Sequence, residues 1–144
     1  MNIAAVLSNK GREVATIAEG ATLGQAAAEL TRHKIGALVV VDDSGGVAGV
    51  LSERDIVACL AEHGDVQLGE RSVAVAMTAP AITVTEATPV LTALALMTAR
   101  RIRHLPVLKD ERLTGIVSIG DLVKYRIDDI ERQAEAMRAY IQSA

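Results

Sequence analysis

The sequence predicts an α/β (α+β) fold built from two copies of one unit, each reading strand–helix–strand–strand–helix, with a long helix at the C-terminus. Three observations support this fold class: an internal repeat, short apolar runs bounded by turn residues, and amphipathic segments that begin at capping residues. Half of the 144 residues are apolar but only Tyr125 and Tyr140 are aromatic, so small aliphatic side chains must fill the core. A chain of this length buries roughly two-thirds of its unfolded surface, and needs no metal or disulfide for stability.

The repeat appears when the first half of the chain is laid on the second. A shift of 67 residues aligns the first part of the unit, and a shift of 66 aligns the rest, with the slip in the turn after Asp43. The matched pairs are Thr16/Thr83, Glu19/Glu86, Ala26/Ala93, Ala28/Ala95, Ile35/Ile102, Leu38/Leu105, Val40/Val107, Asp43/Asp110, Gly49/Gly115, Ser52/Ser118 and Asp55/Asp121. We therefore expect one tandem module over residues 1-144, with repeats at 14-61 and 81-128, a polar linker at 62-80 and an amphipathic helix at 127-143.

The elements of the first copy follow from periodicity and turn chemistry. A helix capped by Thr22 follows a short first strand, and turn residues 42–46 separate two buried strands. A second helix begins at Ser52. The expected strands are Val14–Ile17, Ala37–Val41 and Val47–Leu51.

The second copy repeats this order. Its first helix is expected to be capped by Thr88, with Pro89 at the first helical position, and its second helix to begin at Ser118. The expected strands are Ile82–Val84, Leu105–Leu108 and Leu113–Val117.

The C-terminal segment has an apolar row at helical spacing, which predicts an amphipathic helix of about five turns. The row consists of Ile127, Ile130, Ala134, Met137 and Ile141. This helix either packs on its own domain or also makes a dimer contact.

Charge and composition limit the function classes. A net charge of −3 argues against nucleic acid as the main partner. Cys59, in an apolar run, is expected to be a small buried hydrophobe and not a nucleophile. Met1–Leu7 lacks the positive flank of a signal peptide, and no apolar stretch is long enough to span a bilayer. We expect a cytoplasmic protein that contacts no membrane.

Two segments carry a family resemblance. The run Ile102–Val107 followed by Gly115–Asp121, and the run Ile35–Asp42 followed by Gly49–Asp55, each resemble a CBS domain, and the Val75–Thr78 bridge is typical of the family. The resemblance, to stand-alone bacterial tandem CBS proteins, covers about residues 3 to 128. It implies a Bateman module: two copies related by a pseudo-twofold axis, with two clefts between them. Such modules commonly form homodimers and bind adenosine-containing ligands.

The Gly-h-h-Ser-x-x-Asp pattern, in which h is aliphatic, offers a chemical basis for the ligand binding that the resemblance implies. A helix N-terminus offers free N–H groups to phosphate, and an Asp one turn later can accept hydrogen bonds from ribose hydroxyls. By resemblance, we expect ribose recognition at Asp55 and Asp121 and phosphate contact at Ser52 and Ser118. The rival interpretation is a helix capping box, which uses the same residues to satisfy backbone donors.

The two copies differ in charge. Arg103 and His104 stand where the family places basic side chains toward phosphate, whereas Gly36 and Ala37 occupy the matching positions of the first copy. The half-site of the second copy, with Asp121, is therefore expected to be the stronger one. Arg54, Ile82, Thr83, Ile102, Pro106 and Met77 complete the expected nucleotide-binding residues. Arg54 is expected to contact phosphate, and Ile82, Ile102, Pro106 and Met77 to form an apolar slot around adenine.

These features favour a stand-alone, regulatory, energy-sensing module that binds AMP, ADP, ATP or NAD(H), with S-adenosylmethionine favoured less, and signals to a separate effector protein. The alternative is a structural or interaction module with no nucleotide bound. No catalysis, catalytic cofactor or metal is expected, because the histidines at 33, 63 and 104 have no metal-ligand spacing and no nearby nucleophile.

Overall fold

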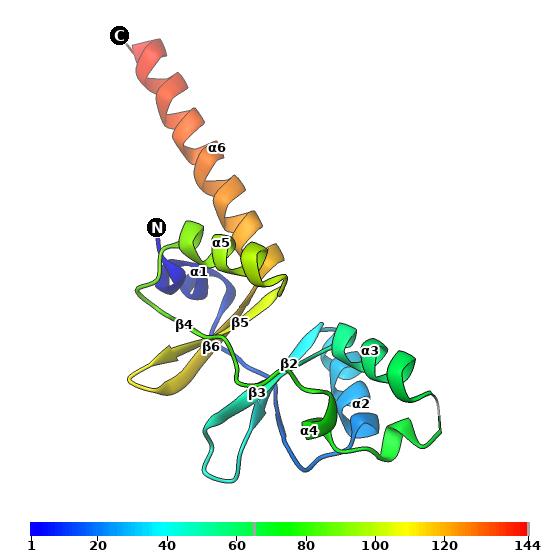
Figure 1. The fold of residues 1–144 in the computed structure, drawn as a ribbon. Helices are drawn as coiled ribbons and strands as arrows, with labels where there is room; N and C mark the ends of the chain where they lie inside the picture. The colour runs from blue at the N-terminus through cyan, green and yellow to red at the C-terminus, as the bar shows by residue number, and fades with distance from the viewer. Residues whose placement is uncertain (65, 144) are drawn as a thin grey trace.

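The computed structural model describes residues 1–64 and 66–143, and it contains two lobes with a three-stranded sheet each (Figure 1). The first lobe holds β1 (Thr16–Ala18), α2 (Leu23–His33), β2 (Ala37–Val41), β3 (Val47–Ser52) and α3 (Glu53–His63). The second lobe holds β4 (Val84–Thr85), α5 (Val90–Arg100), β5 (His104–Lys109), β6 (Arg112–Ser118) and α6 (Ile119–Ser143). In both sheets the middle strand pairs parallel to the first strand and antiparallel to the third. The predicted fold class and the doubled order of elements are confirmed.

The hairpin turns explain the one-residue slip in the repeat. In the second lobe Lys109 pairs with Arg112, and the two turn residues Asp110 and Glu111 both have positive φ, as a tight two-residue hairpin requires. The turn of the first lobe, residues 42–46, is longer, and Asp42 organises it by accepting hydrogen bonds from the N–H groups of two later turn residues. Both sheets have a bulge at the matched position, so the extra residue of the first copy lies in this longer turn.

Each lobe has its own aliphatic core, but a segment from outside its repeat completes each one. Helix α1 (Ile3–Lys10), which the sequence analysis did not anticipate, buries Ile3, Val6 and Leu7 in the core of the second lobe. The N–H groups of residues 3 and 4 donate to carbonyls at the start of that lobe, each at 2.9 Å. The segment that precedes the first repeat therefore belongs structurally to the second lobe.

The first lobe receives an equivalent segment from the linker. A short 3₁₀ helix (Leu68–Glu70) leads to α4 (Val73–Ala76), whose Val73 is fully buried in the first core. The N–H of Val73 donates to the carbonyl of Ala21 at 2.8 Å. Cys59 is buried in the same core as a free thiol, as expected.

Two matched glycines allow these segments to cross the sheets. A Cβ on Gly49 would lie 2.6 Å from the backbone oxygen of Thr78, and a Cβ on Gly115 would lie 2.8 Å from a methyl group of Leu7. Each glycine lies on the third strand of its sheet, where a chain segment packs directly against the backbone. Close approach therefore explains why both copies have glycine here.

Three local expectations need correction. The C-terminal helix expected at 127–143 is not a separate element, because α6 runs continuously from Ile119. Thr88 does not cap α5: its hydroxyl accepts the N–H of Thr85, and Pro89 occupies the N-cap without a side-chain bond. The first strand of each copy is shorter than expected, at three and two residues. Thr22 caps α2 as predicted, in a full capping box.

No helix in the described part of the chain has both the length and the sustained hydropathy that crossing a bilayer requires.

Candidate functional site

Two clefts lie between the lobes, and each takes residues from both repeats. The first cleft is a cavity of about 150 Å³, into which the start of α3 and the end of α5 bring their residues. Its lining consists of Val50, Ser52, Arg54, Asp55, Thr78, Ala81, Ile82, Arg101, Ile102, Arg103 and His104. Side chains from the first repeat thus face side chains from the second.

The second cleft is larger, about 1250 Å³, and uses the opposite halves of the two repeats. Its lining consists of Lys10, Gly11, Arg12, Glu13, Val14, Ala15, His33, Lys34, Ile35, Gly36, Ala37, His104, Ile116, Ser118 and Asp121. The end of α2 here takes the place that the end of α5 takes in the first cleft.

This arrangement separates residues that the sequence analysis had grouped. Arg103 lies in the first cleft with Asp55, whereas Asp121 lies in the second, and His104 alone among them lines both. The physical reason is the relation between the lobes: the helix N-terminus of one lobe faces the segment that enters the middle strand of the other lobe. The expected half-site of Arg103 with Asp121 is therefore not formed.

The other predicted residues fall into two groups. Ser52, Arg54, Ile82 and Ile102 line the first cleft, and Ser118 lines the second. Thr83, Pro106 and Met77 are missing from the lining of both clefts in the described part of the chain. Pro106 is a buried residue in the middle of β5, and Met77 packs against Gly49 and the first core.

Both Ser-x-x-Asp motifs form reciprocal capping boxes. At α3 the N–H of Ser52 donates to Asp55 at 2.9 Å, and the N–H of Asp55 donates to Ser52 Oγ at 3.1 Å. The equivalent distances at Ser118 and Asp121 are 2.8 and 3.1 Å. The capping interpretation is thus confirmed, but it does not exclude a ligand, because an ionised carboxylate has about four acceptor sites.

Capping does limit how the helix N-termini could hold phosphate. The N–H groups of Ser52 and Asp55 are used in the box, and that of Glu53 donates to the carbonyl of Gly36 at 3.0 Å. At the start of α6 the N–H of Ile119 donates to the carbonyl of Arg103 at 2.8 Å in the same way. Phosphate recognition in the clefts must therefore depend mainly on side chains.

The two carboxylates differ in what binds their remaining acceptor sites. Asp55 Oδ1 accepts a hydrogen bond from the neutral hydroxyl of Thr78 at 3.1 Å. Asp121 Oδ2 instead accepts from the ammonium of Lys10 at 2.7 Å, and Lys10 also donates to the carbonyl of Ile116 at 2.8 Å. At Asp121 the capping N–H of Ser118 and the ammonium of Lys10 share Oδ2, so a diol there would meet a carboxylate whose charge Lys10 already neutralises. At Asp55 a diol would compete only with a neutral hydroxyl for Oδ1.

The pKa of Asp121 reflects this pairing. Burial acts to raise the pKa, but the hydrogen bonds from Lys10 and from the Ser118 N–H outweigh burial and hold the pKa below its ordinary value. Lys10 is not predictable from the sequence as a partner of Asp121, because 111 residues separate the two and no local pattern links them.

Three arginines give the first cleft its positive charge. Arg54 comes from the first turn of α3, and Arg101 and Arg103 flank Ile102 at the end of α5. Arg101 has left-handed backbone geometry, φ 54°, as the C-cap of α5. Arg101 is not among the binding residues expected from the sequence, and only the packing of the lobes makes it a cleft residue.

His104 occupies the boundary between the clefts. Its ring packs on Gly36, where a Cβ would lie 3.4 Å from Cε1 and Nε2. Burial is the main cause that lowers the pKa of His104 below its ordinary value. Among nearby charges, Asp121 and Glu53 oppose the lowering, and Lys10 and Arg103 add to it.

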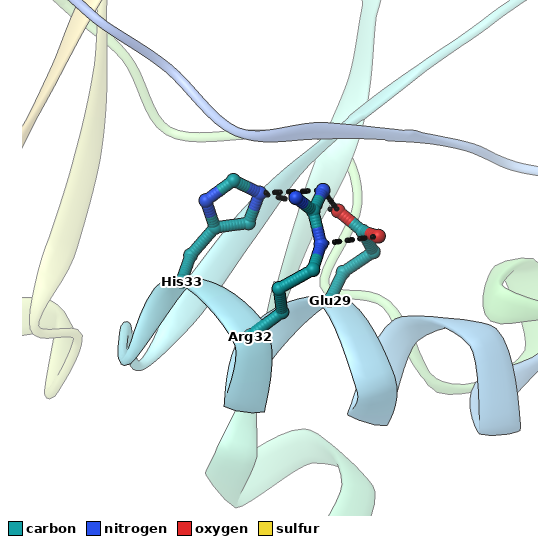
Figure 2. Close-up of polar contacts among 3 residues, drawn as sticks. All are labelled: Glu29, Arg32 and His33. Atoms are coloured by element: carbon teal, nitrogen blue, oxygen red, sulfur yellow. Dashed lines mark hydrogen bonds and ion pairs between the residues drawn. The ribbon is translucent and has the colours of Figure 1, made fainter.

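A polar cluster at the end of α2 borders the second cleft (Figure 2). Arg32 donates to Glu29 at 2.9 Å, and His33 Nε2 lies 3.2 Å from Glu29 and 3.1 Å from Arg32. The hydrogen bond from Arg32 is the largest cause that lowers the pKa of Glu29, and the carboxylate in turn raises the pKa of Arg32. Because the three residues lie within one turn at the helix end and Arg32 and His33 are exposed, this cluster is a local ion pair whose basic members complement the helix dipole.

Among residues 1–64 and 66–143, no three His, Cys, Asp or Glu side chains gather in a way that could hold a metal ion.

Comparison with known proteins gives a consistent result. A family model described as the CBS domain matches residues 10–62 and 71–128. The crystal structure of the CBS-domain containing protein ATU1752 from Agrobacterium tumefaciens is 42% identical, with a TM-score of 0.83 over 87% of this chain and 92% of that one. The mitochondrial CBS domain-containing protein CBSX3 of Arabidopsis thaliana is 36% identical over 132 residues, which are 84% of this chain and 60% of CBSX3.

A third similar structure carries ligands. The CBS domain pair of protein MJ0100, in complex with 5′-methylthioadenosine and S-adenosyl-L-methionine, is 25% identical with a TM-score of 0.78, over 90% of this chain and 98% of that one. Both of those ligands contain adenosine.

Proposed function

Because the chain belongs to the CBS domain family, whose paired domains are generally regulatory modules that sense nucleotides and related ligands, we propose that it binds an adenosine-containing nucleotide in the first cleft. The observation that carries this proposal is the pairing of one accessible carboxylate, Asp55, with three arginines at the junction of the two lobes. Asp55 would accept hydrogen bonds from the ribose diol, replacing the hydroxyl of Thr78.

The rest of the ligand fits the remaining lining. The guanidinium groups of Arg54, Arg101 and Arg103 would bind phosphate oxygens, for which the planar fork of arginine is well suited. Ile82 and Ile102 would sandwich the base in place of aromatic side chains. Since the cavity of about 150 Å³ is smaller than a typical ligand pocket of about 300–1,000 Å³, the phosphates would extend toward solvent or the lobes would open.

The second cleft is the weaker candidate for a nucleotide. Of the cations in its lining, Lys10 pairs with Asp121 and Arg12 pairs with Glu86, and the charge of Lys34 is offset by that of Glu13. This reverses the ranking expected from the sequence, in which the half-site with Asp121 is the stronger one.

Binding in the first cleft would transmit a signal because the ligand touches both lobes. A ligand stabilises whichever relative arrangement of the lobes it binds more tightly, by its difference in affinity between the two states. A separate effector protein would then recognise the favoured arrangement.

The test is a thermal-shift and calorimetry panel of AMP, ADP, ATP, NAD⁺, NADH, S-adenosylmethionine and methylthioadenosine. A true ligand at 100 times its dissociation constant should stabilise the protein by about 2.7 kcal/mol. We expect Asp55→Ala to abolish most of the shift and the matched variant Asp121→Ala to retain it. Arg103→Ala should weaken the binding of phosphorylated ligands, whereas Arg100→Ala, at an exposed residue outside the cleft, should leave their binding unchanged.

Two outcomes would redirect the assignment. Loss of binding in Asp121→Ala with retention in Asp55→Ala would move the site to the second cleft. No shift with any ligand at millimolar concentration would support the competing function, a structural or interaction module with no nucleotide bound.

The finer expectations remain part of this proposal: AMP, ADP, ATP or NAD(H) as the ligand, an energy-sensing role, no catalysis, a homodimer and a cytoplasmic location. The proposed domain boundaries, 14-61 and 81-128, belong here as well. The complex of MJ0100 is a reason to test S-adenosylmethionine on equal terms with the nucleotides.

A further inference from the structure

The last part of α6 extends away from the body of the protein (Figure 1). All side chains from Ile130 to Ser143 are exposed, although this stretch includes several large apolar residues. An isolated helix of about 14 residues is marginal in water, and most helices in proteins depend on packing of an apolar face. The extension therefore has the character of a helix with an uncovered packing face.

A row of apolar residues that begins earlier in α6, at residue 123, and continues through this extension follows a heptad repeat, and we call this row the seam. Its spacing alternates between four and three residues along Val123, Ile127, Ile130, Ala134, Met137 and Ile141. In heptad notation, positions 127, 134 and 141 are a, and positions 123, 130 and 137 are d. The exposed fraction is 48% for Ile130 and 65% for Ile141. A strict 3.5-residue period is typical of a two-helix seam and differs from the 3.6-residue period of a helix that packs on a globular core.

The seam lies on a different face from the one that holds α6 to its own lobe. Leu122 is fully buried and Tyr125 packs against the second core, so these residues define the face that contacts the body. At about 100° per residue, the seam is rotated by roughly a third of a turn from that face. A second helix could therefore lie along the seam without displacing the contacts of α6 with its own lobe.

We propose that the seam pairs with α6 of a second copy of this chain, as a parallel two-helix coiled coil. Flanking charges select this orientation. In a parallel pair, Arg126 at a g position faces Glu131 of the partner subunit at an e position, and the twofold axis repeats this attractive contact. Arg126 also lies 3.5 Å from Asp129 on its own helix, so it would join two carboxylates.

An antiparallel pair at full overlap places like charges together. Glu131 would then face its own copy, and Lys124 would face Arg138, so both e–e contacts would be repulsive. A lipid surface is also disfavoured, because a membrane-bound amphipathic helix carries a Lys- and Arg-rich polar face. The charged residues of α6 from position 128 to position 138 instead mix both signs: Asp128, Asp129, Glu131, Arg132, Glu135 and Arg138.

Cross-linking tests the orientation. Met137→Cys, at a d position, should form a disulfide-linked dimer under mild oxidation, because the two copies of residue 137 face each other in a parallel pair. The matched variant Gln133→Cys, at a g position, should not, because its two copies lie on opposite sides of the seam. If the Gln133→Cys variant formed the disulfide-linked dimer and the Met137→Cys variant did not, the parallel arrangement would be overturned. The unmodified chain, with its buried Cys59, supplies the background.

Oligomeric state tests the seam itself. Light scattering after size-exclusion chromatography should give a dimer for the unmodified chain and monomers for the double variant Ile130→Glu/Met137→Glu. Ala139→Glu, on the opposite face of the same helix, should remain dimeric and thereby exclude a general effect of added charge. Far-UV circular dichroism that loses no more helical signal than the exposed end of α6 could supply would show that the two lobes remain folded. A double variant that stays dimeric, or an unmodified chain that is monomeric, would overturn the proposal.

Discussion

At the scale of single residues, the two aspartates at matched positions show how one local motif acquires two electrostatic environments. Asp55 and Asp121 cap their helices identically, through a serine three residues earlier. Their remaining contacts differ, because Thr78 reaches the first and Lys10 reaches the second. The local pattern sets the position of each carboxylate, and a residue distant in sequence sets its charge balance.

His104 gives a testable consequence for stability. Burial lowers its pKa in the folded protein, so the unfolded chain binds more protons at mildly acidic pH. The free energy of unfolding should therefore be at its full value above about pH 6.5 and should fall as the pH drops below it. His104→Gln should remove this part of the pH dependence, measured by chemical denaturation between about pH 7.5 and pH 5.

The lowered pKa of Asp121 affects the free energy of unfolding in a separate, more acidic pH range. Its contribution is present above the ordinary aspartate pKa and is lost only as the pH falls below about 4. A slope between pH 7 and 5 that persists in His104→Gln would contradict the assignment to His104.

At the scale of elements, the third strand of each sheet is where a crossing segment meets the backbone. Gly49 in β3 and Gly115 in β6 are the contact points, but their neighbours differ. The contact at Gly49 is a backbone oxygen, which cannot move without shifting the 77–80 segment, whereas the contact at Gly115 is the end of a side chain.

We expect Gly49→Ala to destabilise the protein by about 1–3 kcal/mol, since the added methyl group would lie 2.6 Å from the oxygen of Thr78. Gly20→Ala is the matched control, because a Cβ at Gly20 would have nothing within 4 Å. Denaturant unfolding measures both. Equal stability of the two variants would mean that the 77–80 segment adapts at no measurable cost.

At the scale of the whole molecule, the two lobes exchange segments across the repeat. Helix α1 precedes the first repeat but completes the second core, and α4 precedes the second repeat but completes the first core. Figure 1 shows α1 beside α5 in the lobe that also holds α6. The connecting segment at residues 11–15 therefore runs between the lobes, and it contributes residues to the second cleft.

Leu7→Ala tests this exchange. Leu7 is 1% exposed in the second core, so its truncation should cost about 2–5 kcal/mol, the range found for buried leucines. Ser8→Ala, one residue along on the exposed side of α1, should change stability by less than about 0.5 kcal/mol. If Leu7→Ala were equally neutral, α1 would not be part of the second core in solution.

The sequence by itself determined the local structure of this protein. The doubled order of strands and helices, the Thr22 cap and the buried Cys59 follow from apolar periodicity and from contacts between residues three or four apart, which a sequence displays directly. The same local rules misplaced the cap of α5, because the N-cap is Pro89 and the hydroxyl of Thr88 accepts the N–H of Thr85 instead.

Only the tertiary structure decided how the cleft residues combine. Arg101 and Arg103 share a cleft with Asp55, and Lys10 forms an ion pair with Asp121. The reason is that the helix N-terminus of each lobe faces the segment that enters the middle strand of the other lobe. None of these pairs has a fixed sequence separation that a motif could encode. The sequence supplies the chemical groups at matched positions, and the packing of one lobe on the other determines which groups share a cleft.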